Sequence, residues 1–414
     1  MPSLAAPEPD LEPEVEPLQP LVEPADGVPE VTTTPEGLAD VARAMAAGTG
    51  PVAVDAERAS GYRYGQSAYL VQLRREGAGT ALIDPVPLPD LRVLDDALAG
   101  TEWVLHAANQ DLPCLAEVGL APASLFDTEL AARLLGRARV GLGHIVAEEL
   151  GFALAKEHSA ADWSTRPLPQ DWLRYAALDV ELLVELRDRL ASELEAQGKL
   201  EWALEEFEAI RTAPPATPRV DPWRRTSAMH TVRTARGVAV VRELWLARED
   251  LARRRDRSPG RILPDAAIVA AAHALPRSEA ELVALPAFAG KNTRRSSAYW
   301  WGAVARALAL PERELPPRRL AAVPGTPPPP RSWPDKDPEA AARLEAVRGV
   351  VKGLAAALAL PQENLLAPAA QRQLAWTPPA TVDPASVRAA LTDLGARQWQ
   401  IGLVADPLAE ALRA

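Results

Sequence analysis

The sequence predicts a mixed α/β domain followed by two small all-helical domains. Short apolar runs alternate with amphipathic stretches over residues 35–210, and beyond them apolar residues follow helical spacing in two blocks separated by proline-rich segments. The chain has 414 residues, which is enough for several domains of roughly 100–200 residues or smaller.

The first 34 residues are acidic and rich in proline. Residues 1–36 hold nine acidic and no basic side chains, and prolines recur between them. Such a segment has little apolar surface to bury, so we expect a disordered tail over residues 1–34. An inert, solubilising tail is the simpler interpretation, and partner binding is the alternative.

Composition argues against several classes of protein. No apolar run approaches the roughly 18–20 residues that span a bilayer, and the N-terminus lacks the basic and apolar regions of a secretory signal. Cys114 is the single cysteine, which excludes a disulfide framework and a thiolate metal site. We therefore expect a cytoplasmic protein.

The α/β domain is expected over residues 35–210. It should open with a helix at Thr34-Pro35, because proline is favoured in the first helical turn. Runs rich in Val, Leu and Ile predict strands at 52–54, 69–73, 81–83 and 103–105. Helical spacing follows at 91–98, 128–135, 142–150 and 172–194. Three strands in succession, then alternation with helices, indicate a mixed sheet flanked by helices.

Two helical blocks follow proline-rich linkers. We place a linker at 211–235, a helical domain at 236–315, a second linker at 316–337 and a last helical domain at 338–414. The similar lengths of the two blocks suggest that the last is a diverged copy of the first.

The charge of the chain is unevenly distributed. The formal net charge is −11, which by itself disfavours a polyanionic partner. Residues 211–331, however, carry 22 Lys or Arg against 10 Asp or Glu. This basic module permits phosphate binding by one part of the chain.

Three carboxylate motifs are candidates for chemistry. Asp55 and Glu57 end a predicted strand as D-x-E and share a face, where two like charges favour a bound cation. Asp111 follows another predicted strand and begins a helix. Tyr175 and Asp179 lie one turn apart on a helix. Each motif alone has a plainer interpretation: a solvated turn, a capping aspartate, and a core tyrosine beside a surface charge.

The order and spacing of these motifs resemble the DEDD exonuclease superfamily, in its tyrosine-containing subclass, and within it the ribonuclease D family. The resemblance covers about residues 37–210. Three further stretches support it: Phe126-Asp127-Thr128, Asp162-Trp163-Ser-Thr-Arg166-Pro167-Leu168 and Tyr175-Ala-Ala-Leu-Asp179-Val180.

This resemblance implies a ribonuclease H-like fold and a two-metal site. Two divalent cations, Mg²⁺ or Mn²⁺, would be held by Asp55, Glu57, Asp111 and Asp179, and Tyr175 would position the nucleophilic water. Arg58 departs from the aromatic or aliphatic residue that often follows the D-x-E motif, which puts in doubt how the terminal nucleotide is held.

Three residues near these motifs have two interpretations each. Asp127 resembles a family position, but we expect it to cap the helix that starts at Thr128. His106 is a candidate substrate contact, with a hydrogen-bonded structural histidine as the alternative. Arg166 is a candidate phosphate contact, and an internal ion pair is the favoured alternative.

Residues 243–265 resemble the helicase-and-ribonuclease-D C-terminal (HRDC) domain. The resemblance implies an auxiliary nucleic-acid-binding module, and a solvated helical face is an equal alternative. The candidate phosphate contacts are Arg253, Arg254, Arg255, Arg257, Lys291, Arg294 and Arg295. The last block resembles a divergent second HRDC-type module. It is not visibly basic, so we expect it to pack against the nuclease domain.

The expected function is that of a 3′–5′ exoribonuclease. By family resemblance, it would trim structured RNA precursors, transfer RNA foremost, and release nucleoside 5′-monophosphates. We also expect the protein to be a monomer. One alternative is a 3′–5′ DNA exonuclease with the same chemistry, because no motif reveals contacts to the 2′-hydroxyl. The other is a non-catalytic nucleic-acid-binding scaffold, which the intact acidic positions and Tyr175 disfavour.

Overall fold

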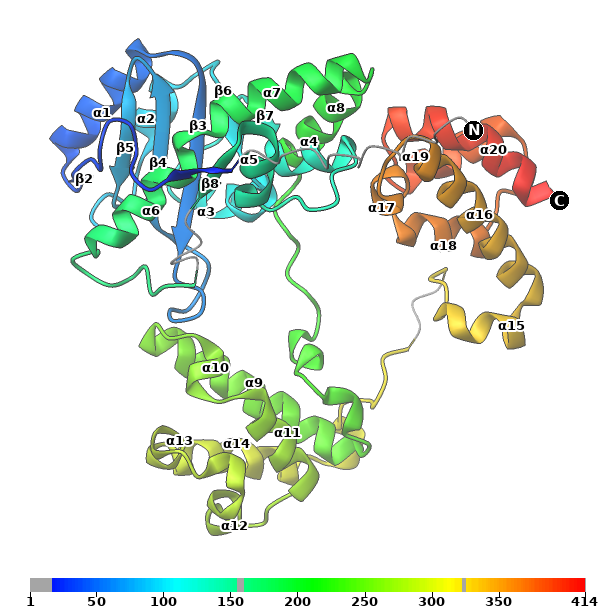
Figure 1. Cartoon of the computed structure of the whole chain (residues 1–414). Coiled ribbons are helices and arrows are strands. Elements are labelled where there is room, and N and C mark those ends of the chain that lie inside the picture. The colour runs from blue at the N-terminus through cyan, green and yellow to red at the C-terminus, as the bar shows by residue number, and fades with distance from the viewer. Residues whose placement is uncertain (1–16, 155–159, 322–324, 414) are drawn as a thin grey trace, which may run out of the picture.

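The computed structural model describes residues 17–154, 160–321 and 325–413 (Figure 1). Within them it contains one α/β domain and two helical domains, which confirms the predicted fold class. No helix in this described part is both long and apolar enough to cross a membrane.

A mixed sheet forms the centre of the α/β domain. The described strands lie in the order β2-β5-β4-β3-β6-β7. The pairs β3–β4 and β4–β5 are antiparallel, whereas β2–β5, β3–β6 and β6–β7 are parallel. The strands are β2 (Val31–Thr32), β3 (Thr49–Arg58), β4 (Ala68–Glu76), β5 (Gly79–Ile83), β6 (Glu102–Leu105) and β7 (Ser124–Asp127).

Helices cover both faces of this sheet. On one face the main apolar core includes residues from most of the helices. On the other, α6 packs over Leu70 and Leu82 together with the buried Trp163. The helices are α1 (Pro35–Ala47), α2 (Arg92–Ala97), α3 (Leu112–Glu117), α4 (Thr128–Leu134), α5 (Leu142–Leu150), α6 (Gln170–Glu181), α7 (Leu183–Ala196) and α8 (Leu200–Arg211).

Two expectations need correction. The segment 17–34 is not an unstructured tail, because β1 (Gln19–Leu21) pairs with β8 (Phe152–Leu154) and β2 joins the edge of the sheet. Residues 1–16 of the expected tail lie outside the described residues. The helical spacing over 172–194 belongs to two helices, because Leu182 has a non-helical backbone conformation and separates α6 from α7. The register of hydrophobic positions continues across that break, which hid it in the sequence.

The first helical domain has a core of its own. Its buried residues include Trp223, which lies in the expected linker, so the folded domain begins within 211–235. Its helices are α9 (Ala235–Arg255), α10 (Pro259–Ile262), α11 (Asp265–Ala274), α12 (Glu279–Ala284), α13 (Lys291–Arg295) and α14 (Ser297–Ala309).

The last helical domain packs against the nuclease domain, as expected. Their apolar residues belong to one continuous core, and Trp202 stacks on Trp399 with ring centroids 5.0 Å apart. Its helices are α15 (Trp333–Lys336), α16 (Pro338–Ala357), α17 (Gln362–Leu365), α18 (Pro368–Trp376), α19 (Pro384–Asp393) and α20 (Gln398–Arg413). Trp333 is fully buried, so the end of the expected 316–337 linker is also part of a fold.

Candidate active site

Strand β3 presents Asp55 and Glu57 on one face of the sheet. Residues two apart in a strand point the same way, and Asp55 and Glu57 are half-buried while the intervening Ala56 is buried. Their partners across β4 are Gln72 and Leu70. Because α6 covers Leu70, both carboxylates point toward α6.

Helix α6 supplies the third carboxylate and a phenol. Asp179 and Tyr175 are one turn apart, and the Tyr175 hydroxyl donates a hydrogen bond to the Asp179 carboxylate. Burial, together with the neighbouring carboxylates, raises the pKa of Tyr175. The phenol therefore keeps its proton and acts as a donor.

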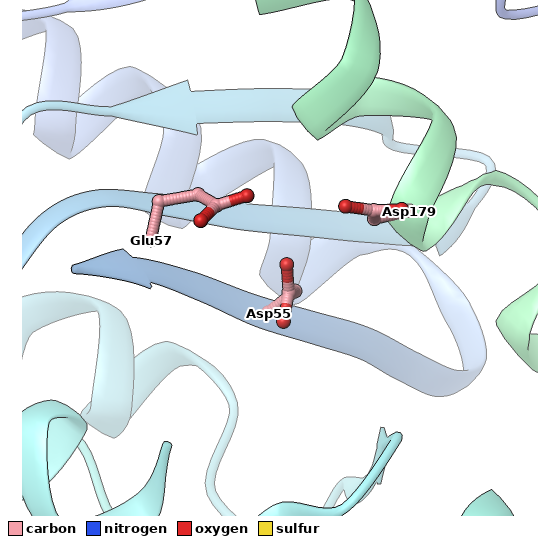
Figure 2. Close-up of side chains that lie close together, drawn as sticks. All are labelled: Asp55, Glu57 and Asp179. Carbon is pink, nitrogen blue, oxygen red and sulfur yellow. The ribbon is translucent and has the colours of Figure 1, made fainter. Parts of the chain in front are cut away.

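Three carboxylates meet in this space. Ligand oxygens of Asp55, Glu57 and Asp179 all lie within 4.8 Å of one another. Figure 2 shows the three side chains converging from β3 and α6. Burial, then the charges of Asp55, Asp179 and Asp111, raises the pKa of Glu57 to about 10. Burial also raises the pKa values of Asp55 and Asp179.

Asp111 lines the same cavity but does not join this group of three. It lies at the start of α3, yet its side chain caps no backbone N–H, which argues against a capping role. It pairs instead with Arg58, whose Nη2 lies 3.3 Å from Oδ1. Burial and the charge of Asp55 raise the pKa of Asp111 to about 8.

The acidic cluster suits an oxygen-seeking divalent cation. Its donors are carboxylate oxygens, the ligand type that Mg²⁺ and Mn²⁺ prefer, and Arg58 is the cation that opposes the charge of both Glu57 and Asp111. Carboxylates held this close must either keep protons or share a cation. Asp55 and Glu57 each interact electrostatically with both Asp111 and Asp179, so the four carboxylates form one electrostatic cluster.

A cavity of 620 Å³ opens over these residues. His106 lines it, and burial lowers the pKa of this histidine to about 4, so its imidazole is neutral. Its Nδ1 lies 2.9 Å from the Thr128 hydroxyl, in keeping with the structural alternative. Sequence reasoning missed His144, which also lines the cavity at the start of α5. No recognised motif contains it.

Asp127 and Arg166 have structural roles. Asp127 caps α4 through the backbone N–H groups of Glu129 and Leu130, and it also accepts from Ala107 and Ala108. The Arg166 guanidinium pairs with Asp84 at 2.6 and 2.8 Å, and its remaining N–H groups reach backbone carbonyls. The internal ion pair is therefore present, and a phosphate contact by Arg166 stays a prediction.

The predicted basic contacts divide into two sets. Arg253 donates to the Tyr64 hydroxyl of the nuclease domain at 3.2 Å, and Arg254 pairs with Asp250 at 2.8 Å. Within the described residues, five others have no side-chain hydrogen bond or ion pair: Arg255, Arg257, Lys291, Arg294 and Arg295. Nucleic-acid binding by any of them stays a prediction.

Family models match the three folded units separately. Residues 29–195 match a 3′–5′ exonuclease family, residues 238–304 match the HRDC domain, and residues 326–412 match a 3′–5′ exonuclease C-terminal domain. The last match comes from a different family than the HRDC domain. The expectation that the last block is a second HRDC-type copy therefore stays a prediction.

Relatives cover much of the chain. The ribonuclease D of Escherichia coli K12 is 32% identical over 295 residues, which cover 69% of this chain and 77% of that protein. The chain belongs to the ribonuclease D family. Another ribonuclease D, from Shewanella sp. ANA-3, is 35% identical over 215 residues, and the match spans 51% of this chain and 55% of that protein.

Solved structures extend the likeness to nearly the whole chain. A protein from Bifidobacterium adolescentis has a TM-score of 0.88 at 38% identity and covers 96% of this ribonuclease D-family chain and 100% of its own. The E. coli ribonuclease D structure has a TM-score of 0.67 at 26% identity, with 93% and 98% covered. Family membership confirms the predicted class, a hydrolytic 3′–5′ exoribonuclease.

Proposed function

We propose that this protein is a metal-dependent exoribonuclease that shortens structured RNA precursors from the 3′ end, with transfer RNA precursors as the favoured substrate. The observation that carries the proposal is the convergence of Asp55, Glu57 and Asp179 within 4.8 Å, with Asp111 in the same cavity. The solved E. coli relative is described as an exoribonuclease involved in structured RNA processing, which supports this substrate class.

We place two divalent cations in the cluster. Asp55, Glu57, Asp111 and Asp179 would hold them, because oxygens of Asp55, Glu57 and Asp179 lie within 4.8 Å of one another and Asp111 lines the same cavity. When bound, such a pair neutralises the phosphate, activates water and stabilises the leaving oxygen.

The chain itself orients the reactants. The Tyr175 hydroxyl, held against Asp179, is placed to direct a water molecule toward the 3′-terminal phosphodiester. Attack in line with the leaving 3′ oxygen breaks the P–O bond and releases a nucleoside 5′-monophosphate. The shortened RNA then carries a new 3′ hydroxyl. The neutral His106 lines the cavity as an uncharged wall beside the substrate.

End-labelled oligomers test polarity, polymer and metal together. With 5′-labelled single-stranded RNA and Mg²⁺ or Mn²⁺, we expect a ladder that shortens stepwise, and 3′-labelled RNA should give labelled mononucleotide at once. EDTA should stop both reactions. Faster degradation of a matched DNA oligomer would favour a DNA exonuclease, and unchanged RNA in every metal would favour a non-catalytic scaffold.

A choice between substrates tests the finer proposal. A transfer RNA precursor with a 3′ extension should be trimmed faster than an unstructured RNA of equal length. Equal rates on both would argue against the transfer RNA assignment while leaving the exonuclease activity in place.

A further inference from the structure

Arg58 is a residue of fixed positive charge inside an otherwise acidic site. Among the described residues that line the 620 Å³ cavity it is the only arginine or lysine, beside the carboxylates of Asp55, Glu57, Asp111 and Asp179. Its side chain is 26% exposed, so the cavity gives access to it. Because an aromatic or aliphatic residue often stands at this position in the ribonuclease D family, the family resemblance assigns Arg58 no role.

A local irregularity of the sheet brings Arg58 to the cavity. Glu57 and Arg58 are neighbours in β3, and in a regular strand their side chains would point to opposite faces. The register between β3 and β4 shifts at this step, since Glu57 lies opposite Leu70 whereas Arg58 lies opposite Ala68. A bulge of this kind re-aims the side chain beside it. Glu57 and Arg58 therefore line the same cavity from one strand end.

Arg58 connects this strand end to the turn that carries Asp111. Its Nη1 donates to the Gln110 carbonyl at 2.9 Å, and its Nη2 lies 3.3 Å from Asp111 Oδ1. Its charge also opposes the rise in the pKa values of Asp55, Glu57 and Asp111. The guanidinium thus stabilises the ionised form of these carboxylates, which is the form that binds a cation.

The guanidinium keeps donors for a further ligand. Arginine carries several N–H donors in a rigid fork. Among the described residues, the Gln110 carbonyl is its only hydrogen-bond acceptor and Asp111 its only ion-pair partner. Asp111 needs this counter-ion most while no cation is bound to it. Once Asp111 ligates a cation, its attraction for Arg58 weakens, and the guanidinium is free to bind another oxyanion.

The charge balance of the site favours a phosphate as that oxyanion. Two divalent cations would balance the four carboxylates, so Arg58 would leave the site with one excess positive charge. The RNA that enters this cavity under the proposed function carries a negative charge on each phosphodiester. Arginine forks match phosphate oxygens in a bidentate manner. The described lining offers no second arginine or lysine for this contact.

We propose that Arg58 binds a non-bridging oxygen of the 3′-terminal phosphodiester and holds that phosphate beside the acidic cluster. The proposal rests on the proposed function for the identity of the phosphate. For the choice of residue it rests on the bulge at Glu57 and Arg58, on the accessible guanidinium and on its unused donors.

Binding of the product tests this contact without any cleavage. Adenosine 5′-monophosphate carries the phosphate that the reaction would release, whereas adenosine lacks it. In calorimetric titrations of the full chain with saturating Mg²⁺, Arg58→Gln should weaken binding of the monophosphate about tenfold and keep adenosine binding within about twofold of wild type. Arg58→Lys keeps the charge but loses the fork, so its loss of affinity should be smaller.

Arg92→Gln is the matched control. Arg92 belongs to the same domain, pairs with Asp90 as Arg58 pairs with Asp111, and lies outside the cavity. The substitution removes one guanidinium and one ion pair, and the affinity for both ligands should stay close to wild type. Equal losses in the Arg92 and Arg58 variants would overturn the contact in favour of a general effect of net charge.

Three further results would overturn the proposal. A deficit of Arg58→Gln that vanishes when Mg²⁺ is raised further would mean that Arg58 only orders a metal ligand. Equal losses for the monophosphate and for adenosine would indicate a structural role. Wild-type protein that binds the two ligands equally would have no phosphate contact to lose. None of these titrations involves cleavage, so failure of the proposed function would appear separately, as intact RNA in the end-label assay.

Discussion

At the scale of single residues, the acidic cluster is held together against its own charge. Asp55, Glu57 and Asp179 approach within 4.8 Å although each is half-buried. A protein that only bound RNA would gain nothing from such a cluster, because it repels phosphate. The free-energy cost of holding these carboxylates together is consistent with a site that binds cations.

Asp179→Asn should reduce exonuclease turnover by on the order of 10²–10³-fold, because it removes a charged ligand from the cluster. The matched control is Asp171→Asn, on the same helix but exposed, which should retain wild-type turnover. Initial rates on 5′-labelled RNA, with circular dichroism to verify folding, provide the measurement. Near-normal turnover of the Asp179 variant would remove this residue from the site.

Tyr175→Phe should slow cleavage more than it weakens binding. The ring stays in place, and only the hydroxyl that contacts Asp179 is lost. We expect a roughly 10²-fold slower single-turnover rate with RNA affinity within about twofold of wild type. A large loss of affinity with an unchanged rate would make Tyr175 a binding residue.

The metal-free protein should lose stability as pH rises. The folded pKa of Asp111 is about 8 and that of Glu57 about 10, whereas unfolded carboxyls titrate near 4. Between these values the folded state binds more protons, so each unit of pH lowers the free energy of unfolding. Melting temperature in EDTA should fall from pH 5 to pH 8, and Mg²⁺ should raise it more at pH 8. Glu57→Gln should flatten the pH profile, and a profile that rises with pH would contradict the assignment.

At the scale of elements, Asp127 joins two turns that shape the site. Its carboxylate accepts backbone N–H groups from the start of α4 and from the turn that precedes Asp111. Ala107 in that turn has a φ of 60°, a left-handed conformation that needs support from its surroundings. The cap therefore fixes the backbone that carries Asp111.

Asp127→Ala should destabilise the protein by about 3 kcal/mol, because it leaves buried donors unpaired. Asp127→Asn keeps an acceptor oxygen and should cost less. Chemical denaturation measures the free energy of unfolding of both variants. A loss of stability in Asp127→Ala no larger than that of an ordinary surface substitution would contradict this capping role.

At the scale of the whole molecule, the two helical domains contact the nuclease domain differently. The first does so through polar contacts around the loop after β3, where Asp256 accepts from the Tyr64 N–H and pairs with Arg63. The last shares an apolar core with it, and Lys199 donates to the carbonyls of Leu134 and Leu358, one in each domain. A deletion of residues 211–414 would therefore expose nuclease core as well as remove basic residues.

Trp399→Ala should destabilise the chain by about 3–5 kcal/mol. It removes the stack on Trp202 and the indole hydrogen bond to Glu206 at 3.0 Å. Differential scanning calorimetry should show a lower melting temperature, with turnover at low temperature preserved because the active site is untouched. Unchanged melting would mean that this interface contributes little to stability.

Local patterns predicted much of the fold. The strands at 52–54, 69–73, 81–83 and 103–105 lie inside β3, β4, β5 and β6, because alternation and flanking turns are properties of the segment itself. The strands β1, β2, β7 and β8 were missed. Each has only two to four residues, which gives a weak periodic signal.

The sequence by itself determined the fold class, the family and the identity of the acidic residues, because the motifs are short, local and ordered along the chain. Only the tertiary structure decided which side chains meet. It paired Asp111 with Arg58, Arg166 with Asp84 and Arg253 with Tyr64. Such contacts join residues up to about two hundred positions apart, and their energies depend on burial and distance, which no local pattern encodes.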